Sequence, residues 1–204
     1  MTERETVDHP LERMIFFSDA VFAIAITLLV IEIAVPHLGH HASSAAYRDA
    51  LLALLPSIAA FILSFFVIGR FWIGHHNAFS RIHHYRPELL WPNLRFLCAI
   101  AFMPFATAFL GANLGAFVPA LLYNLAMLVT ALLNLHLVRL VMRSADTDGD
   151  PAELRELRSR PQSVVAATAL SVLFSPLIPA FSQVGLATIP LWQRLFARQR
   201  RQPA

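Results

Sequence analysis

The sequence predicts an all-α integral membrane protein, and three observations support this fold class. The chain is 57% hydrophobic and only 14% charged over its 204 residues, whereas a soluble domain has roughly 25% charged residues. Its apolar runs are long enough for helices to cross the hydrocarbon core of a bilayer. All sixteen basic residues are arginines, and they gather at the ends of these runs, which is a topology signal. We therefore expect a lipid bilayer, and no nucleic acid, among the partners.

Prolines and polar stretches mark the limits of the predicted helices. Pro36 ends the first helix, because proline cannot continue a helix. A polar, charged loop is expected over 143–160, and Pro176 with Pro179 divides the last apolar stretch into a tight hairpin. The chain is expected to be one transmembrane domain, 1–204, with spans at 11–35, 51–75, 89–110, 117–142, 162–178 and 179–197.

The arginines decide between five and six spans. Six spans with cytoplasmic N- and C-termini place four arginine groups on the cytoplasmic side and leave one arginine, Arg48, in the three outer loops. Five spans would put the C-terminal arginines outside, against the positive-inside rule. The four groups are Arg4 and Arg13; Arg70, Arg81 and Arg86; Arg139, Arg143, Arg155, Arg158 and Arg160; and Arg194, Arg198, Arg200 and Arg201.

The first predicted helix carries a carboxylate, Asp19, inside its apolar run. Charge is costly in a membrane, so such a residue calls for a function or a partner. At about 100° per residue, the wheel separates two sets of side chains. We expect Asp19 to face the interior of its own subunit, and the second set to face something else, such as another copy of the chain. The first set is Asp19, Phe22, Ala23, Ile26 and Val30; the second is Ile24, Thr27, Leu28, Ile31 and Val35.

Arg13 and Asp19 are six residues apart, so they are not neighbours on one helix face. If they share a network, other polar residues at the same membrane edge must bridge them. The alternative is that Arg13 only anchors the helix at the interface and Asp19 only pairs with a structural partner. A structural role for Asp19 is favoured over direct handling of protons or ions. The candidates for the network are Ser18, Trp72, His75, His76 and Asn93, with the choice between the two histidines left open.

Other chemistry receives little support from the sequence. Adjacent histidines on a helix point apart, and no set of His, Cys, Asp and Glu has ligand spacing, so no metal site is expected. No catalytic or nucleotide-binding motif is present, and we expect neither an enzyme nor a cofactor. Glu32 either concentrates cations at a pore mouth or is simply exposed, and snorkelling accounts for Arg95.

The start of the first helix resembles a known signature. Arg13-x-x-x-Phe17-Ser18-Asp19 is similar to the RxxxFSD motif of the transmembrane protein 175 family, which comprises lysosomal potassium channels in animals and shorter homologues in bacteria. The resemblance extends along the chain and is strongest over the first two helices. Its further elements are Phe71-Trp72-x-x-His75-His76, Asn93 and Pro104-Phe105-x-Thr107.

This resemblance implies a fold and a mechanism. Bacterial members carry one six-helix repeat and form homotetramers, in which the first helix lines a central pore. Ile24 would then form a hydrophobic constriction, Thr27 a polar ring, and Leu28 and Ile31 further apolar layers. The implied function is a weakly selective, potassium-preferring cation channel, with potassium as the permeant ion, in the bacterial inner membrane. The supporting network would consist of Arg13, Phe17, Ser18, Asp19, Trp72, His75 or His76, and Asn93.

Two other functions remain open from the sequence. A proton channel or proton-coupled transporter would use Asp19 and a histidine as a relay. A non-conducting membrane scaffold or an intramembrane enzyme would carry no ion current.

Overall fold

The computed structural model describes residues 9–39, 41–144 and 151–199. The regular structure of this part of the chain is helical throughout. Its elements are α1 (His9–Ile31), α2 (Ser44–Ala53), α3 (Leu55–Phe79), η1 (Pro87–Leu89), α4 (Leu90–Ala112), α5 (Phe117–Ser144), α6 (Pro151–Phe174), η2 (Pro179–Thr188) and α7 (Ile189–Gln199). The all-α prediction is thereby confirmed.

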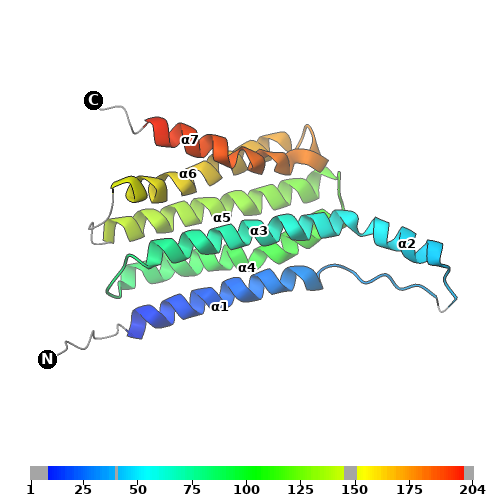
Figure 1. Cartoon of the computed structure of the whole chain (residues 1–204), viewed down its shortest axis with the longest axis horizontal. Helices are drawn as coiled ribbons and strands as arrows, with labels where there is room; N and C mark the ends of the chain where they lie inside the picture. Colours follow the sequence, from blue (N-terminus) through cyan, green and yellow to red (C-terminus); the bar gives the residue numbers. More distant parts are fainter. Residues whose placement is uncertain (1–8, 40, 145–150, 200–204) are drawn as a thin grey trace.

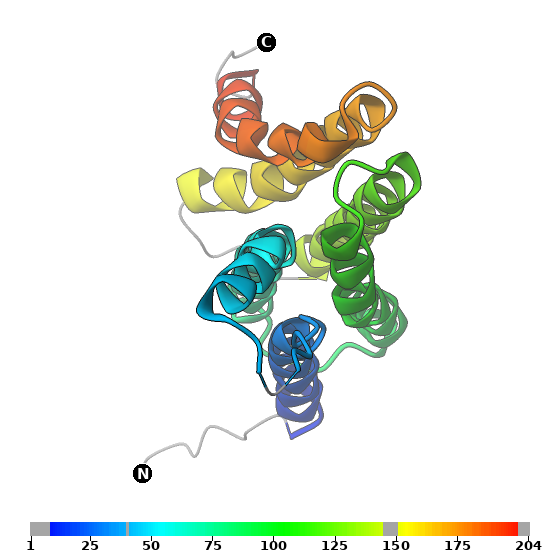
Figure 2. The same cartoon turned by 90° about the vertical axis from the view of Figure 1, so that its right-hand side faces the viewer.

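The long helices lie side by side along the length of the molecule (Figure 1). Among the described residues, four helical segments are long and apolar enough to cross a membrane: α1, α3, η1 with α4 (Pro87–Ala112), and α5. α1 begins and α7 ends at the same end of the bundle, whereas α2 projects from the opposite end (Figure 1). Seen along the helices, α6 and α7 form the layer farthest from α1 (Figure 2).

The core lies where α1, α3 and α4 meet and continues between α4 and α5. Phe22 of α1 packs edge-on against Phe96 of α4 at a centroid distance of 5.8 Å. Phe71 of α3 contacts the same ring at 5.9 Å. Edge-to-face aromatic packing of this kind adds to the burial of apolar area. The first helix is therefore attached to two others along one of its faces.

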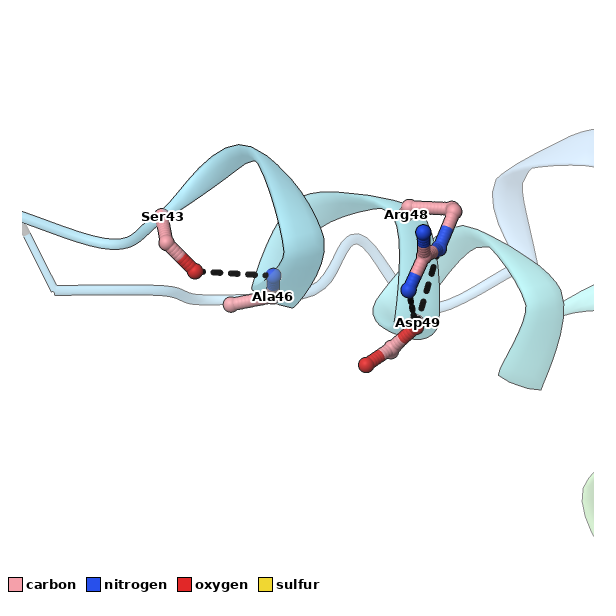
Figure 3. Close-up of polar contacts among 4 residues, drawn as sticks. All are labelled: Ser43, Ala46, Arg48 and Asp49. Carbon is pink, nitrogen blue, oxygen red and sulfur yellow. Dashed lines mark hydrogen bonds and ion pairs between the residues drawn. The ribbon is translucent and has the colours of Figure 1, made fainter.

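The first predicted helix ends earlier than expected, and the second predicted helix begins later. α1 ends at Ile31, before the predicted residue 35, because the backbone leaves the helical conformation in the residues before Pro36. α2 begins in the stretch between the first two predicted spans and is capped where the Ser43 hydroxyl oxygen accepts the Ala46 N–H at 3.2 Å (Figure 3).

Pro56, the second residue of α3, causes the break between α2 and α3. It lacks an N–H, and its ring opposes the carbonyl four residues earlier, so the helix breaks at Leu54 and restarts at Leu55. On α2, the Arg48 guanidinium lies 3.2 Å from the Asp49 carboxylate in an exposed ion pair (Figure 3).

The last third of the described chain differs most from the prediction. α6 begins at Pro151, inside the segment expected as a loop, and passes through Pro161. The predicted span at 179–197 is the 3₁₀ segment η2 followed by α7, a helix of 11 residues. Leu157 is buried in the early part of α6, so this part packs as helix although it is too polar to be recognised as a membrane span.

Candidate functional site on the first helix

The buried side chains of α1 recur every three or four residues, which is the spacing of one helix face. This face is centred on Ser18, about 100° around the helix from Asp19. Ala23 and Val30, which the wheel grouped with Asp19, are exposed in the subunit. The buried face differs from the face that the wheel predicted because α1 packs more extensively against α4 than against α3. The buried set is Leu11, Met14, Ser18, Phe22, Ala25 and Leu29.

A buried chain of hydrogen bonds fastens α1 to α4 and α3. The Ser18 hydroxyl donates to the Met14 carbonyl oxygen at 2.8 Å and accepts from Asn93 Nδ2 at 2.9 Å. Asn93 Oδ1 lies 3.0 Å from His75 Nε2. Since the amide oxygen can only accept, His75 Nε2 carries the proton in this arrangement. Ser18, His75 and Asn93 are each at most 1% exposed, so their pairing satisfies polar groups that would be costly to bury alone.

Aromatic packing fixes the orientation of His75. Its ring stacks on Phe79 at a centroid distance of 4.2 Å and lies 5.7 Å from Phe22. His76 is exposed and lies beside Trp72, 5.8 Å away between ring centroids. Of the two adjacent histidines, the structure joins His75 to the buried hydrogen bonds.

Asp19 lies at the edge of the buried face and has a partner on α3. The Trp72 indole Nε1–H donates to Asp19 Oδ1 at 2.8 Å. A hydrogen bond to a carboxylate is stronger than one between neutral groups. Asp19 and Ser18 therefore fasten the same turn of α1 to two different helices, and Asp19 bonds directly to neither histidine.

Arg13 and Phe17 are not part of these contacts. Both side chains are exposed, Phe17 at 52%. Arg13 makes no hydrogen bond or ion pair with the described part of the chain. Phe17, Ile24 and Ile31 follow one another at intervals of seven residues, so they share the outward face of α1.

That outward face is apolar apart from one hydroxyl. Ile24, Leu28 and Ile31 are 58%, 40% and 72% exposed. Thr27, also exposed, places its Oγ1 3.0 Å from the Ala23 carbonyl oxygen and 2.9 Å from that of Ile24. Its proton is thus directed to its own helix, and the oxygen lone pairs remain available on the exposed side. Such an oxygen suits a cation better than an anion.

Two residues left open by the sequence lie apart from these contacts. Glu32 is exposed just beyond the end of α1, and Arg95 is exposed near the start of α4. Within residues 9–39, 41–144 and 151–199, no three His, Cys, Asp or Glu side chains form a group suited to a metal ion.

Similarity to known proteins agrees with the signature on α1. The family described as the endosomal/lysosomal potassium channel TMEM175 matches residues 13–104. A potassium channel of Chryseobacterium sp. is 32% identical over 144 residues, covering 71% of this chain and 70% of the relative. A potassium channel of Chamaesiphon minutus is 35% identical over 168 residues, covering 77% and 82%.

The chain belongs to the TMEM175 family.

A solved TMEM175 structure extends this similarity to the C-terminal helices. The crystal structure of a lysosomal potassium-selective channel TMEM175 homologue from Chamaesiphon minutus matches with a TM-score of 0.73 and 27% sequence identity. The match covers 95% of this chain and all of that one. Together with its four candidate spans, this identifies the chain as a multi-pass membrane protein of the TMEM175 family.

Two buried polar clusters of this TMEM175 chain were not predicted from its sequence. Ser64 Oγ lies 3.1 Å from Tyr123 Oη and accepts from Thr107 Oγ1 at 2.8 Å, linking α3, α4 and α5. In the second, Asn124 Nδ2 lies 2.8 Å from the hydroxyl oxygens of both Ser175 and Ser182. Polar residues inside apolar helices are a signal that partners exist, but sequence spacing cannot say which residues pair.

Proposed function

We propose that this chain forms a homotetrameric, potassium-preferring cation channel of weak selectivity in the bacterial inner membrane. Each subunit would cross the membrane six times, with α6 as the fifth crossing and η2 with α7 as the sixth. Four copies of α1 would surround the pore. The names of the relatives from Chryseobacterium and Chamaesiphon, both called potassium channels, support the permeant ion.

One observation carries the pore assignment: one face of α1 is buried against α4 and α3, and the opposite face is apolar and exposed in the described part of the subunit. The Ser18 and Asp19 contacts hold the helix to α4 and α3. The opposite face leaves Ile24 and Ile31 more than half exposed in the subunit. Four such faces around an axis form apolar rings, and a ring of this kind closes a pore by excluding water.

Thr27 supplies the only hydroxyl on this stretch of the outward face, which runs from Ile24 to Ile31. Four Thr27 oxygens around the axis would replace part of the hydration shell of a cation. A single ring of Thr27 hydroxyls differs from a potassium-channel filter, which consists of successive rings of backbone carbonyls. We therefore expect a preference for potassium that is modest.

The direction of the chain supports cytoplasmic termini. α1 begins and α7 ends at one end of the bundle (Figure 1). The described arginines, except Arg48 on α2, lie in the parts of their helices and loops nearer to that end. The positive-inside rule then assigns this end to the cytoplasm.

The proton-relay alternative requires Asp19 and a histidine to exchange a proton. Asp19 instead accepts from the Trp72 indole, and His75 pairs with the amide of Asn93. Neither an indole nor an amide takes up and releases protons readily near neutral pH. The contacts of these residues therefore favour a fastening role over a relay.

The test is Ile24→Asn in purified protein, recorded in planar bilayers with potassium and sodium on opposite sides. A polar ring would ease wetting of the constriction, and a barrier lower by about 1.4 kcal/mol raises the current about tenfold. Potassium preference should fall at the same time. Val30→Asn is the matched control, because Val30 is 52% exposed on another part of the α1 surface. Equal currents for wild type and Ile24→Asn would refute the pore assignment.

A further inference from the structure

A long apolar groove runs along the outside of α3, away from the pore face of α1. Residues of α3 line it, together with residues of α5, α6, η2 and α7 and with Ile26 of α1. Its volume is about 1160 Å³, above the ~300–1,000 Å³ of ordinary small-molecule sites. Ile62 and Phe66 on its α3 wall are 47% and 70% exposed. In Figure 2, α6 and α7 lie beyond α3 and α5 as a separate layer.

An unpaired arginine lies within this apolar wall. Arg70 lines the groove and is nine residues before the end of α3 at Phe79, which is about 14 Å along a helix. It is exposed and makes no hydrogen bond or ion pair with the described residues. A charge at this depth in a membrane span needs a partner.

A buried acceptor without a partner lies at the same level. Asn134 of α5 lines the groove, is 5% exposed, and lies ten residues before the end of α5 at Ser144. Its Oδ1 has no hydrogen-bond partner among the described residues. Arg160 lines the groove nine residues after the start of α6 at Pro151. Since α3 and α5 end and α6 begins at one end of the bundle (Figure 1), these three polar groups share one depth.

We propose that this groove binds an anionic glycerophospholipid, of the phosphatidylglycerol type, from the leaflet at the arginine-rich end. Its phosphate pairs with the Arg70 guanidinium, and a headgroup hydroxyl donates to Asn134 Oδ1. The acyl chains follow Phe66 and Ile62 towards the middle of the bilayer. The lipid thus supplies an anion for Arg70, a donor for Asn134 and acyl chains to cover the apolar side chains of the groove.

A second copy of the chain fits this groove less well. A protein segment would have to present a carboxylate to Arg70 at this depth. In the described membrane spans, the carboxylate at a comparable depth is Asp19, ten residues after the start of α1. Asp19 already accepts from Trp72 at 2.8 Å. A lipid phosphate has no such competing partner.

The proposal requires membrane insertion but no ion conduction, so it does not rest on the proposed function. The test is native mass spectrometry of the detergent-purified protein with added palmitoyl-oleoyl phosphatidylglycerol or phosphatidylcholine. One lost charge-assisted contact corresponds to about a tenfold loss of affinity. Both lipids carry a phosphate, but the choline cation of phosphatidylcholine opposes the attraction to Arg70. Wild type should therefore prefer phosphatidylglycerol by about that factor, and Arg70→Gln should remove the part of the preference that depends on charge. Arg95→Gln, at an exposed arginine that does not line the groove, should retain it.

A second variant tests the apolar part separately. Ile62→Trp fills the groove without changing charge and should lower the binding of both lipids. Equal binding of the two lipids by wild type, or an unchanged preference in Arg70→Gln, would overturn the proposal. So would a shift in subunit assembly on Arg70→Gln with unchanged lipid occupancy, because a neighbouring subunit would then cover the groove.

Discussion

The hydrogen bond between His75 and Asn93 makes a quantitative prediction, because both partners are buried and lie on different helices. His75→Phe keeps a ring that can stack on Phe79, whose centroid lies 4.2 Å away, but leaves Asn93 Oδ1 without its donor. Asn93→Leu removes the acceptor and leaves His75 Nε2 unpaired. The double variant leaves neither atom behind. Each single change should therefore be costly, and the second change should cost less when the first is present.

The magnitude follows from what each variant leaves unpaired. Ser18 keeps its 2.8 Å bond to the Met14 carbonyl in every variant, so it adds no orphaned donor. A buried group without its partner costs about 1–3 kcal/mol in soluble proteins. Interhelical hydrogen bonds in a membrane protein average about 0.6 kcal/mol and reach about 1.7 kcal/mol in double-mutant cycles. We therefore expect the double variant to be about 0.6–1.7 kcal/mol more stable than the sum of the single effects.

The assay is reversible unfolding in mixed micelles by titration with dodecyl sulfate, followed by tryptophan fluorescence. The free energy of unfolding is compared for wild type, the two single variants and the double variant. A control cycle pairs Asn93→Leu with His76→Phe, since His76 is exposed and contacts Trp72 instead of Asn93. Independent sites add within about 0.3–0.5 kcal/mol. If the His75 cycle is as additive as the His76 cycle, the buried contact does not exist as described.

Two further predictions use the same titration. Trp72→Phe removes the indole donor that lies 2.8 Å from the Asp19 carboxylate. We expect it to lower the free energy of unfolding by about 1.5 kcal/mol, the lower end for a hydrogen bond to a charged group. An unchanged unfolding midpoint would argue against the contact. Gly111→Ala should destabilise by about 1–3 kcal/mol, because its new Cβ would lie 2.8 Å from the backbone Cα of Ser57. The control is Gly69→Ala, which has open space around the new Cβ and should be neutral or stabilising by up to about 1 kcal/mol. Equal effects of the two alanine substitutions on the free energy of unfolding would contradict the packing of α3 on α4.

The positions of the membrane helices could be predicted from the sequence where a helix and an apolar run cover the same residues. α1, α3, α4 and α5 all overlap predicted spans, because a helix in lipid satisfies its backbone hydrogen bonds internally and carries mostly apolar side chains. α2 was missed because it is short, although Ser43 before a run of helix formers is a recognisable cap.

The C-terminal third could not be predicted as well. Hydropathy detects the part of a helix that lies in the membrane, whereas α6 begins in the polar segment at Pro151. Burial of Leu157 and Ser159 by tertiary packing stabilises that segment. Pro161 does not end α6, because helices continue through proline where neighbouring groups satisfy the freed carbonyl. η2 is a 3₁₀ helix, so its residues do not follow the 3.6-residue period by which α-helices are predicted.

For the first helix, the sequence alone determined that an apolar span with a polar turn at Ser18 and Asp19 exists, because composition and helical periodicity are local properties. It also separated the Ile24–Ile31 stripe from Asp19. Only the tertiary structure decided that Asn93 and His75 meet Ser18, that Trp72 meets Asp19, and that the buried face is centred on Ser18. These pairings join residues 18–75 positions apart along the chain, and the packing of whole helices, which no local pattern encodes, brings them together.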